Sequence, residues 1–118
     1  MTTARPFDSY SIRIFGGAEG RVAMILCYQG GSFAGRIDFY PDGAALPDDY
    51  LWHPNPSQEY VVLHMPMSRF DAVITTLRYE KPLQLYSYAN REIGASTPGD
   101  GYLTTTTKEP VGEEESSP

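Results

Sequence analysis

The chain has 118 residues and a formal net charge of −6, and its length and charge exclude several classes of protein. A domain of this size buries roughly two-thirds of the surface that its unfolded chain exposes, so it can fold without metal or disulfide bonds. The nine cationic residues are scattered rather than clustered, which makes nucleic acid an unfavourable partner. No apolar run approaches the roughly 18 residues of a membrane span, so we expect a cytoplasmic protein without a membrane contact.

The composition favours strands and turns. Aromatic residues make up 13% of the chain and are typical of strands, whereas ten prolines and eleven glycines indicate many turns. The single cysteine, Cys27, cannot form an internal disulfide. Because it lies in the apolar run VAMILCYQ, we expect a buried thiol rather than a nucleophile.

Three strands are predicted in the N-terminal part of the chain. Residues 9–15 (SYSIRIF) alternate with period two, which is typical of a half-buried strand. Residues 21–28 (RVAMILCY) are apolar on both faces, which predicts a central strand that is covered on both sides. Residues 33–40 (FAGRIDFY) place Phe33 on the inward face, and Gly35 indicates a bulge or a tight bend.

The longest loop is predicted over residues 44–58, because three prolines interrupt it and only DYLW could form a short edge strand. An aromatic platform and an imidazole stand close together in this loop, so Tyr50, Trp52 and His53 are candidate ligand-binding residues. The alternative is that Trp52 covers one end of a barrel while the prolines stiffen the connection.

One helix is predicted, over residues 68–79. Its apolar side chains recur at the i, i+3, i+4 and i+7 positions of one helix face. Ser68 and Asp71 are spaced as a capping box. The stripe spans only about two turns and is too short to be stable alone, so we expect a structural cover that packs on the sheet. The apolar stripe consists of Phe70, Val73, Ile74 and Leu77.

The strand before this helix is predicted over residues 59–65 (EYVVLHM). It contains His64, for which we expect a hydrogen-bonded structural role.

Two further strands, LQLYSYA and GYLTTTT, are predicted after the helix, with residues 90–100 as a long hairpin loop. Gln84, Tyr86 and Tyr88 share one strand face, and Tyr102 is expected to pair across the hairpin. Exposed aromatic strand faces can stack bases or sugars, but no cations accompany this one. We therefore interpret Gln84, Tyr86 and Tyr88 as interface candidates, which pack within the sheet or against another subunit.

The last residues differ from the rest in charge. Residues 109–118 (EPVGEEESSP) have little to bury and carry like charges, which predicts a disordered acidic tail after a single β-rich domain over residues 1–108.

No motif for catalysis or for a cofactor is present. The glycine-rich turns lack the strand–loop–helix setting of a phosphate-binding loop. His53 and His64 are the only histidines and have no partner at a metal-ligand spacing. We therefore predict no metal, no cofactor and no catalytic residue.

The run MSRFDAVITTLRYEKPLQLYSY, followed by YLTTTTKEPVGEEES, resembles small uncharacterised bacterial proteins in which such a helix and strand precede a Glu-Pro-Val-Gly-Glu tail. The resemblance covers the C-terminal half only. It implies a compact bacterial β-domain with one helix, and no activity or catalytic residue comes with it.

These observations predict a mainly β (α+β) fold, a strongly bent antiparallel sheet or small open barrel of about six strands in the order β-β-β-loop-β-α-β-β. The leading hypothesis for function is a non-enzymatic binding or assembly module that forms a homo-oligomer, because small β-domains often pair their exposed edges between subunits. A protein partner is compatible with this hypothesis. The alternative is a small-molecule-binding protein or an enzyme that uses residues 48–55, and a third hypothesis is a single-stranded nucleic-acid binder.

Overall fold

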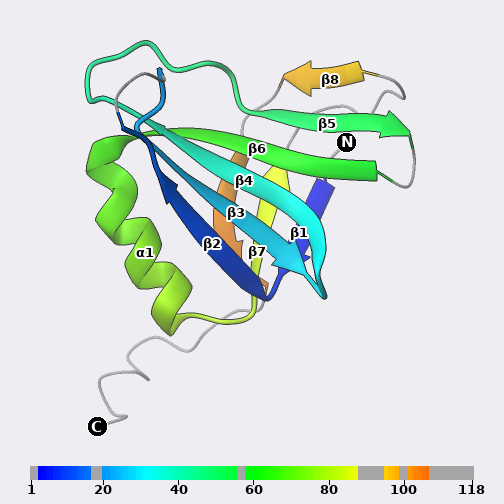
Figure 1. Ribbon diagram of the computed structural model, residues 1–118. Coiled ribbons are helices and arrows are strands. Elements are labelled where there is room, and N and C mark those ends of the chain that lie inside the picture. The colour runs from blue at the N-terminus through cyan, green and yellow to red at the C-terminus, as the bar shows by residue number, and fades with distance from the viewer. Residues whose placement is uncertain (1–2, 17–19, 56–57, 88–94, 99–100, 107–118) are drawn as a thin grey trace, which may run out of the picture.

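The computed structural model describes residues 3–16, 20–55, 58–87, 95–98 and 101–106, which form nine strands and one α-helix (Figure 1). The helix α1 (Phe70–Tyr79) follows a single 3₁₀ turn, Met67–Arg69. The strands are β1 (Thr3–Phe7), β2 (Ser9–Ile14), β3 (Ala23–Gln29), β4 (Ser32–Tyr40), β5 (Tyr50–Asn55), β6 (Gln58–Pro66), β7 (Leu83–Ser87), β8 (Ala95–Pro98) and β9 (Gly101–Thr105).

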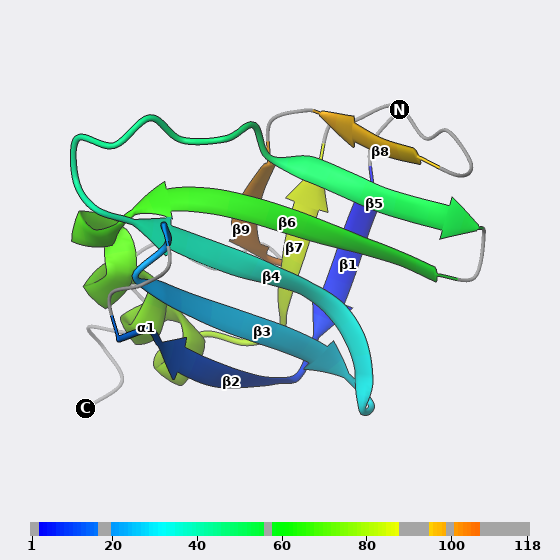
Figure 2. The same ribbon diagram turned by 45° about the horizontal axis from the view of Figure 1, so that its top comes forward.

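The strands form two separate sheets, so the predicted mainly β (α+β) class with one helix is confirmed, and the sheets do not close into a barrel. The large sheet has the order β2-β3-β4-β6-β5-β8, and the small sheet has the order β1-β7-β9. The small sheet crosses behind the large one at a steep angle (Figure 2). All pairings are antiparallel except that of β4 with β6, which lies between β4 and β5 and is antiparallel to β5.

Three strands differ from the prediction. Residues 3–7 form β1, an edge strand that tolerates Pro6 because an edge position does not need every amide. The predicted loop contains β5, at the place where DYLW was expected as a short edge strand, but β5 runs to Asn55 and lies between β6 and β8 instead of at an edge. The predicted hairpin loop contains β8, which pairs with β5. Pairing with neighbouring strands, β7 for β1 and β6 and β8 for β5, outweighed the local proline signal in these segments.

The core lies between the two sheets and α1. Apolar side chains of β3, β4, β5, β6, β7 and α1 pack there, and the predicted stripe of α1 faces it, with Val73 and Leu77 buried. The rings of Phe39 and Phe70 meet edge to face with centroids 5.1 Å apart. Cys27 is buried in this core as predicted, and burial raises the pKa of its thiol to about 12.

The start of the helix differs from the prediction. Ser68 belongs to the 3₁₀ turn, and the N-cap residue is Arg69, which makes no side-chain cap hydrogen bond. The predicted capping box of Ser68 and Asp71 is therefore wrong. Instead, the Ser68 amide donates to Oδ1 of Asp42 at 2.9 Å, so a carboxylate from the loop after β4 satisfies an amide at the start of the helical segment.

A bulge in β4 is confirmed at the predicted place, but it reverses the expected side of Phe33. The register with β3 shifts between Cys27 and Tyr28, so Ala34 is buried in the core and Phe33 lies on the other side of the sheet. Gly35 follows this shift, and a Cβ there would collide with the backbone oxygen of Val61 and lie 2.6 Å from Cδ1 of Leu85. Only glycine permits this close crossing of the two sheets.

Across the described ranges, no helix combines the length and apolarity that crossing a bilayer requires. Tyr88 and the predicted tail 109–118 lie outside the described residues.

Candidate functional site

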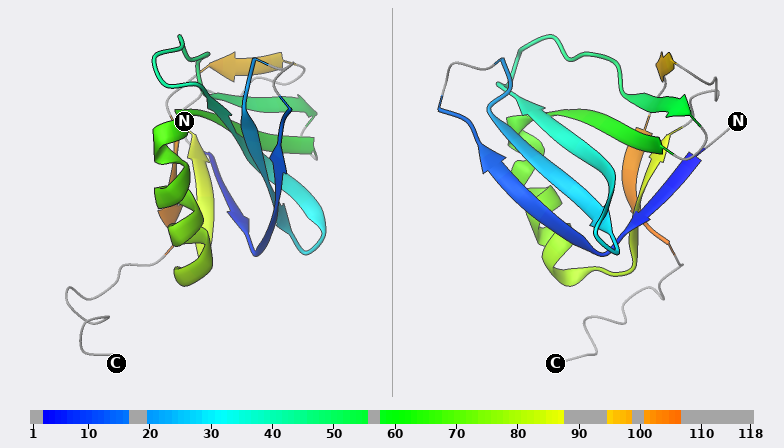
Figure 3. Two further views of the ribbon diagram at one scale, coloured as in Figure 1. Left: turned by 60° about the vertical axis from the view of Figure 1, so that its left-hand side comes forward. Right: turned by 45° about the vertical axis from the view of Figure 1, so that its right-hand side comes forward.

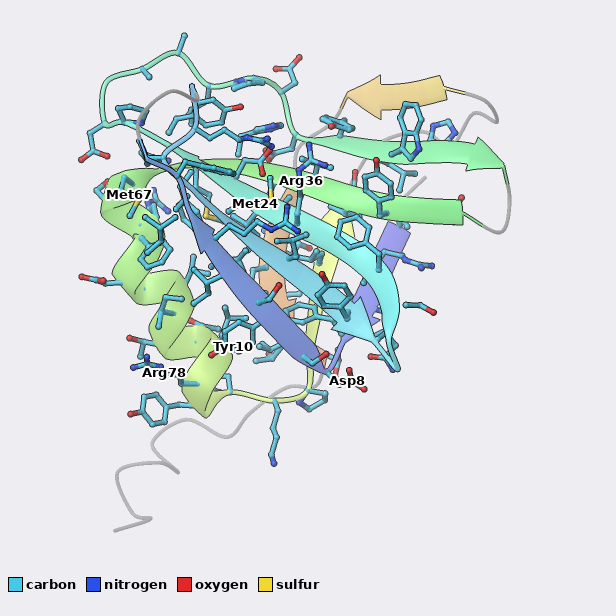
Figure 4. The ribbon with its side chains drawn as sticks, in the orientation of Figure 1. Asp8, Tyr10, Met24, Arg36, Met67 and Arg78 are labelled. Atoms are coloured by element: carbon cyan, nitrogen blue, oxygen red, sulfur yellow. The ribbon has the colours of Figure 1, made fainter. Side chains whose placement is uncertain are left out.

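The large sheet has one face against the core and one face that turns away from the small sheet, which we call the outer face. The alternation along β4 separates the two, because Ile37 and Phe39 are fully buried in the core while Arg36, Asp38 and Tyr40 lie on the outer face. Figure 4 shows Met24 and Arg36 on this side. The polar and aromatic side chains of the outer face are Tyr28, Phe33, Arg36, Asp38, Tyr40, Tyr50, Trp52, Tyr60 and His64.

Asp38 is the centre of the polar part. It is only 1% exposed, yet it lies on the strand face opposite the core. The Arg36 Nε atom donates to both of its carboxylate oxygens, at 3.1 and 3.2 Å, and Nη1 of Arg21 reaches Oδ2 at 3.5 Å. A buried carboxylate is costly unless it is paired and hydrogen-bonded. The two guanidinium groups provide that pairing.

Arg36 connects this ion pair to the neighbouring strands. Its Nη2 atom donates to the Tyr50 hydroxyl at 3.3 Å, so β4 is tied across β6 to β5. Burial would lower the pKa of the Arg36 guanidinium, but the Asp38 carboxylate, together with Tyr50 and Tyr60, outweighs burial and raises the pKa above its ordinary value. Arg36 is therefore a firmly charged group that is already committed to internal partners.

His64 lies between two carboxylates. Its Nε2 atom is 3.8 Å from Oδ2 of Asp38, and its Nδ1 atom is 3.5 Å from Oδ1 of Asp49. The same Asp49 oxygen accepts the His64 backbone amide at 2.7 Å, and its other oxygen accepts the Gly101 amide at 3.2 Å. The His64 side chain is buried, as expected of a structural residue, but its Nδ1 atom makes no hydrogen bond, and the hydrogen bond of His64 to Asp49 comes from its backbone. Asp49 thereby joins the large sheet to the first residue of β9.

Aromatic rings form a continuous row beside the polar network. Tyr28 meets Phe33 with centroids 6.0 Å apart, Phe33 meets Tyr60 at 4.9 Å, and Tyr60 meets Trp52 at 6.3 Å. The first two contacts are edge to face, a favourable aromatic geometry. The row crosses four adjacent strands, β3, β4, β6 and β5. All four rings are half-buried, so they are fixed by their neighbours while part of each still reaches solvent.

Two tyrosine hydroxyls beside the network resist ionisation. Burial raises the pKa of Tyr60, Tyr50 raises it further, and Arg36 opposes both through its charge and a hydrogen bond. Burial likewise raises the pKa of Tyr40, and the Asp38 carboxylate adds to the effect. Both hydroxyls therefore stay neutral through the physiological range and can donate as well as accept hydrogen bonds.

The structure divides the three ligand-binding candidates of the 48–55 segment between the two faces. Tyr50 and Trp52 lie on the outer face, next to Val62 and Tyr60 of β6. His53, one residue further along β5, points to the opposite side and is 0% exposed. The aromatic pair and the imidazole therefore do not converge on one site.

The interface candidates lie elsewhere, on the small sheet. Gln84 and Tyr86 are half-buried on one face of β7. Tyr86 stacks on Tyr102 across the β7–β9 pair, with centroids 4.9 Å apart and an interplanar angle of 19°, which confirms the predicted cross-strand pairing. Tyr88 lies outside the described residues.

The central members of the outer face were not predicted as site residues. Arg36, Asp38 and Asp49 are not among the candidate residues predicted from the sequence. The available signal was the pattern Arg-Ile-Asp within an apolar strand, because a charged residue two positions from an opposite charge on one strand face suggests a pair. Nothing local indicated that His64 would join them.

The arrangement is suited to recognition rather than to proton transfer. The His64 side chain is 4% exposed and held on both sides, so its imidazole cannot reach a substrate. Asp38 is enclosed by its guanidinium partners. Among the described residues, no group of three His, Cys, Asp or Glu side chains is placed to hold a metal ion.

Comparisons with known proteins return no matching family model, no matching curated protein and no matching solved structure, so the resemblance of the C-terminal half stays a prediction.

Proposed function

We propose that this protein is a non-enzymatic binding and assembly module of a bacterial cytoplasm, that it self-associates, and that the outer face of the large sheet binds a protein partner. The observation that carries the proposal is the aromatic row beside a buried carboxylate, Asp38, that is paired with Arg36 and Arg21. The row offers fixed apolar rings, and the network offers hydroxyl groups without an unpaired charge.

The composition of the outer face supports a protein partner. Tyr, Trp, Phe and Arg are the residue types enriched at the centres of protein interfaces. Trp52 and Tyr60 are half-buried neighbours, so little side-chain entropy remains to be lost when a partner covers them. A pre-ordered surface of this kind lowers the cost of binding.

The charges of the outer face favour a protein over a nucleic acid. Binding to a phosphate backbone depends on cations that are free to replace its counterions. Here Arg21 and Arg36 both contact the carboxylate of Asp38. To engage phosphate, they would have to leave a buried carboxylate unpaired, which is costly.

The outer face can be tested with a random peptide library displayed on phage and selected on the full chain. We expect peptides to be enriched and to lose roughly tenfold or more in affinity on Trp52→Ala, as for a residue at the centre of an interface. Tyr86→Ser, on the small sheet, is the matched control and should leave the affinity unchanged. No enrichment, or equal binding to Trp52→Ala, would overturn the assignment of this face. Circular dichroism must first show that both variants are folded.

Self-association is tested by light scattering behind a sizing column. The expected mass is a multiple of the 13.1 kDa chain mass that persists on dilution. A mass of one chain at every concentration would overturn this part of the proposal.

The small-molecule alternative has one supporting observation, because Tyr50 and Trp52 share the outer face with Arg36. Its test is a ligand screen by thermal shift, followed by Trp52 emission, since Trp52 is the only tryptophan in the chain. A single-stranded oligonucleotide added at low salt serves as the comparison, and the charge argument predicts no response to it.

A further inference from the structure

The two sheets formed by the described strands have four edges, and three of these edges carry a feature that limits further pairing. In β1 and β8, Pro6 and Pro98 each remove an amide hydrogen. In β9, the amide of Gly101 is bound to the carboxylate of Asp49. The fourth edge is β2, whose sequence SYSIRI contains no proline and whose residues are exposed except for the half-buried Tyr10. It is the outermost strand of the large sheet (Figures 1 and 3).

From this edge we infer that β2 pairs with β2 of a second copy of the chain, antiparallel and about a two-fold axis at Ile12. The inference rests on the self-association proposed above and names the surface and the register that produce it.

The backbone of β2 directs its free hydrogen-bonding groups to the edge. The Phe15 amide donates to the Val22 oxygen at 3.0 Å, so the Phe15 amide points toward the chain of β3. The direction of the backbone groups alternates along an antiparallel ladder, so those of Ser11 and Arg13 also point toward β3. The amide and carbonyl groups of the residues between them therefore point away from β3. These residues are Tyr10, Ile12 and Ile14.

The same residues carry an apolar strip that the chain leaves in water. Ile12 is 42% exposed and Ile14 is 74% exposed, both on the side of the sheet that faces α1. Tyr79, near the end of α1, is 76% exposed and lines a cavity together with Tyr10. Figure 4 shows Tyr10 in the space between β2 and α1. An exposed apolar edge strand of this kind readily pairs with another chain.

The sequence of β2 is complementary to itself in one register. With the axis at Ile12, each Ile12 faces its counterpart and each Tyr10 faces an Ile14, so all three outward-pointing residues form hydrogen-bonded pairs. Arg13 then faces Ser11 on the other side of the sheet. Moving the axis to Arg13 would lose one of these pairs and would place two arginines opposite each other, which is destabilising. The axis at Ile12 therefore gives the most bonds and no charge conflict.

This register also provides a place for the most exposed isoleucine. Ile14 of one copy lies next to Tyr10 of the other, at the cavity of about 210 Å³ that Tyr10 lines with Leu77 and Tyr79. Pairing removes the apolar strip of both copies from water, and each strip is covered by the same residues of its partner. The result is one continuous sheet across both subunits, and the closed two-fold symmetry stops further growth.

The experiment measures the mass of the full chain by light scattering, for wild type, Ile12→Lys, Ile12→Glu and an equimolar mixture of the two variants. The expected mass of the wild type is twice 13.1 kDa. Each variant alone should fall to the mass of one chain, because like charges would meet on the axis. The mixture should return to the doubled mass, because Lys and Glu would then face each other. Tyr86→Ser is the control and should keep the doubled mass.

Each result separates this inference from the proposed function. A wild-type chain that is monomeric throughout overturns self-association itself, and the β2 pairing with it. A wild-type dimer that persists in Ile12→Lys overturns only the β2 edge, as does a mixture that stays monomeric. Loss of the dimer in Tyr86→Ser would move the interface to the small sheet. Ile12 is 42% exposed and lies outside the buried core, and circular dichroism must first show that its variants are folded.

Discussion

Strand β4 faces two different environments, and the comparison between its two sides explains how the large sheet is stabilised. On the core side, Ile37 and Phe39 are fully buried among apolar side chains. On the outer face, Asp38 is also buried, but guanidinium groups surround it. The core side depends on area removed from water, which is non-directional. The outer face depends on specific pairs, so the loss of one partner leaves another group without compensation.

The largest expected effect comes from removing the centre of the outer face. Asp38→Ala leaves Arg36 and Arg21 without their carboxylate. Breaking a buried ion pair costs about 3–5 kcal/mol, and we expect about 3 kcal/mol here, because both guanidinium groups still reach solvent. Urea unfolding followed by circular dichroism measures this loss. The exposed Arg13→Ala on β2 is a control that should change the free energy of unfolding by less than about 0.5 kcal/mol.

A double substitution tests whether the outer face of β4 can be stabilised in the same way as its core side. Arg36→Met with Asp38→Leu replaces the ion pair with apolar side chains, so the outer face of β4 becomes similar to its core side. Such replacements are often neutral or stabilising, and we expect most of the loss in Asp38→Ala to be recovered. If Asp38→Ala alone costs less than about 1 kcal/mol, Asp38 does not organise the outer face.

The core side gives the second effect, which depends on pH. The pKa of Cys27 is raised from 9.0 to about 12 by burial, so the folded protein keeps its thiol proton where the unfolded chain has lost it. The stabilisation is therefore complete below pH 9 and is lost as the pH rises toward 12. Between these values the free energy of unfolding should fall by about 1.4 kcal/mol per pH unit, which amounts to about 2 kcal/mol at pH 10.5.

The matched variant for this effect is Cys27→Ala. It should show a smaller decrease with pH than the wild type, whatever its stability at neutral pH. A residual decrease is expected above pH 10, because burial also raises the pKa values of Tyr40 and Tyr60. Identical pH dependence in wild type and Cys27→Ala would show that the thiol ionises equally in both states.

Local patterns were enough to predict the elements whose burial follows a simple period. The helix was predicted over 68–79 and forms over 70–79, because its apolar stripe repeats with the period of a helix. The apolar run 21–28 predicted a strand with neighbours on both sides, and β3 lies between β2 and β4. Gly35 predicted the bulge, because a glycine inside a strand pattern marks a bend or a close approach.

The parts that were missed depend on contacts between distant residues. The bulge reversed the side of Phe33, and period-two counting has no means of detecting such a reversal. Residues 50–55 contain a proline and were assigned to a loop, but pairing with β6 and β8 makes them a strand. The network joins three segments: Asp38 lies in β4, Asp49 lies in the loop that precedes β5, and His64 lies in β6. Only the strand order brings these residues together, and no local spacing encodes it.

The smallest expected effect concerns a single hydrogen bond of the outer face. Tyr50→Phe removes the hydroxyl that accepts from Nη2 of Arg36 at 3.3 Å. The aromatic ring stays, so the change isolates the hydrogen bond, which contributes about 0.5–1.5 kcal/mol. We expect a loss of about 1 kcal/mol in urea unfolding, clearly less than for Asp38→Ala, because Arg36 keeps its carboxylate partner.

The control for this substitution is Tyr28→Phe at the other end of the aromatic row, where the ring contact with Phe33 is retained. Its effect should stay within about 0.5 kcal/mol. If Tyr50→Phe is equally silent, the link from β4 to β5 does not contribute to stability, and the charge network ends at Arg36. A loss as large as that of Asp38→Ala would instead mean that the Tyr50 hydroxyl positions Arg36 on its carboxylate. The network would then extend across three strands as one unit.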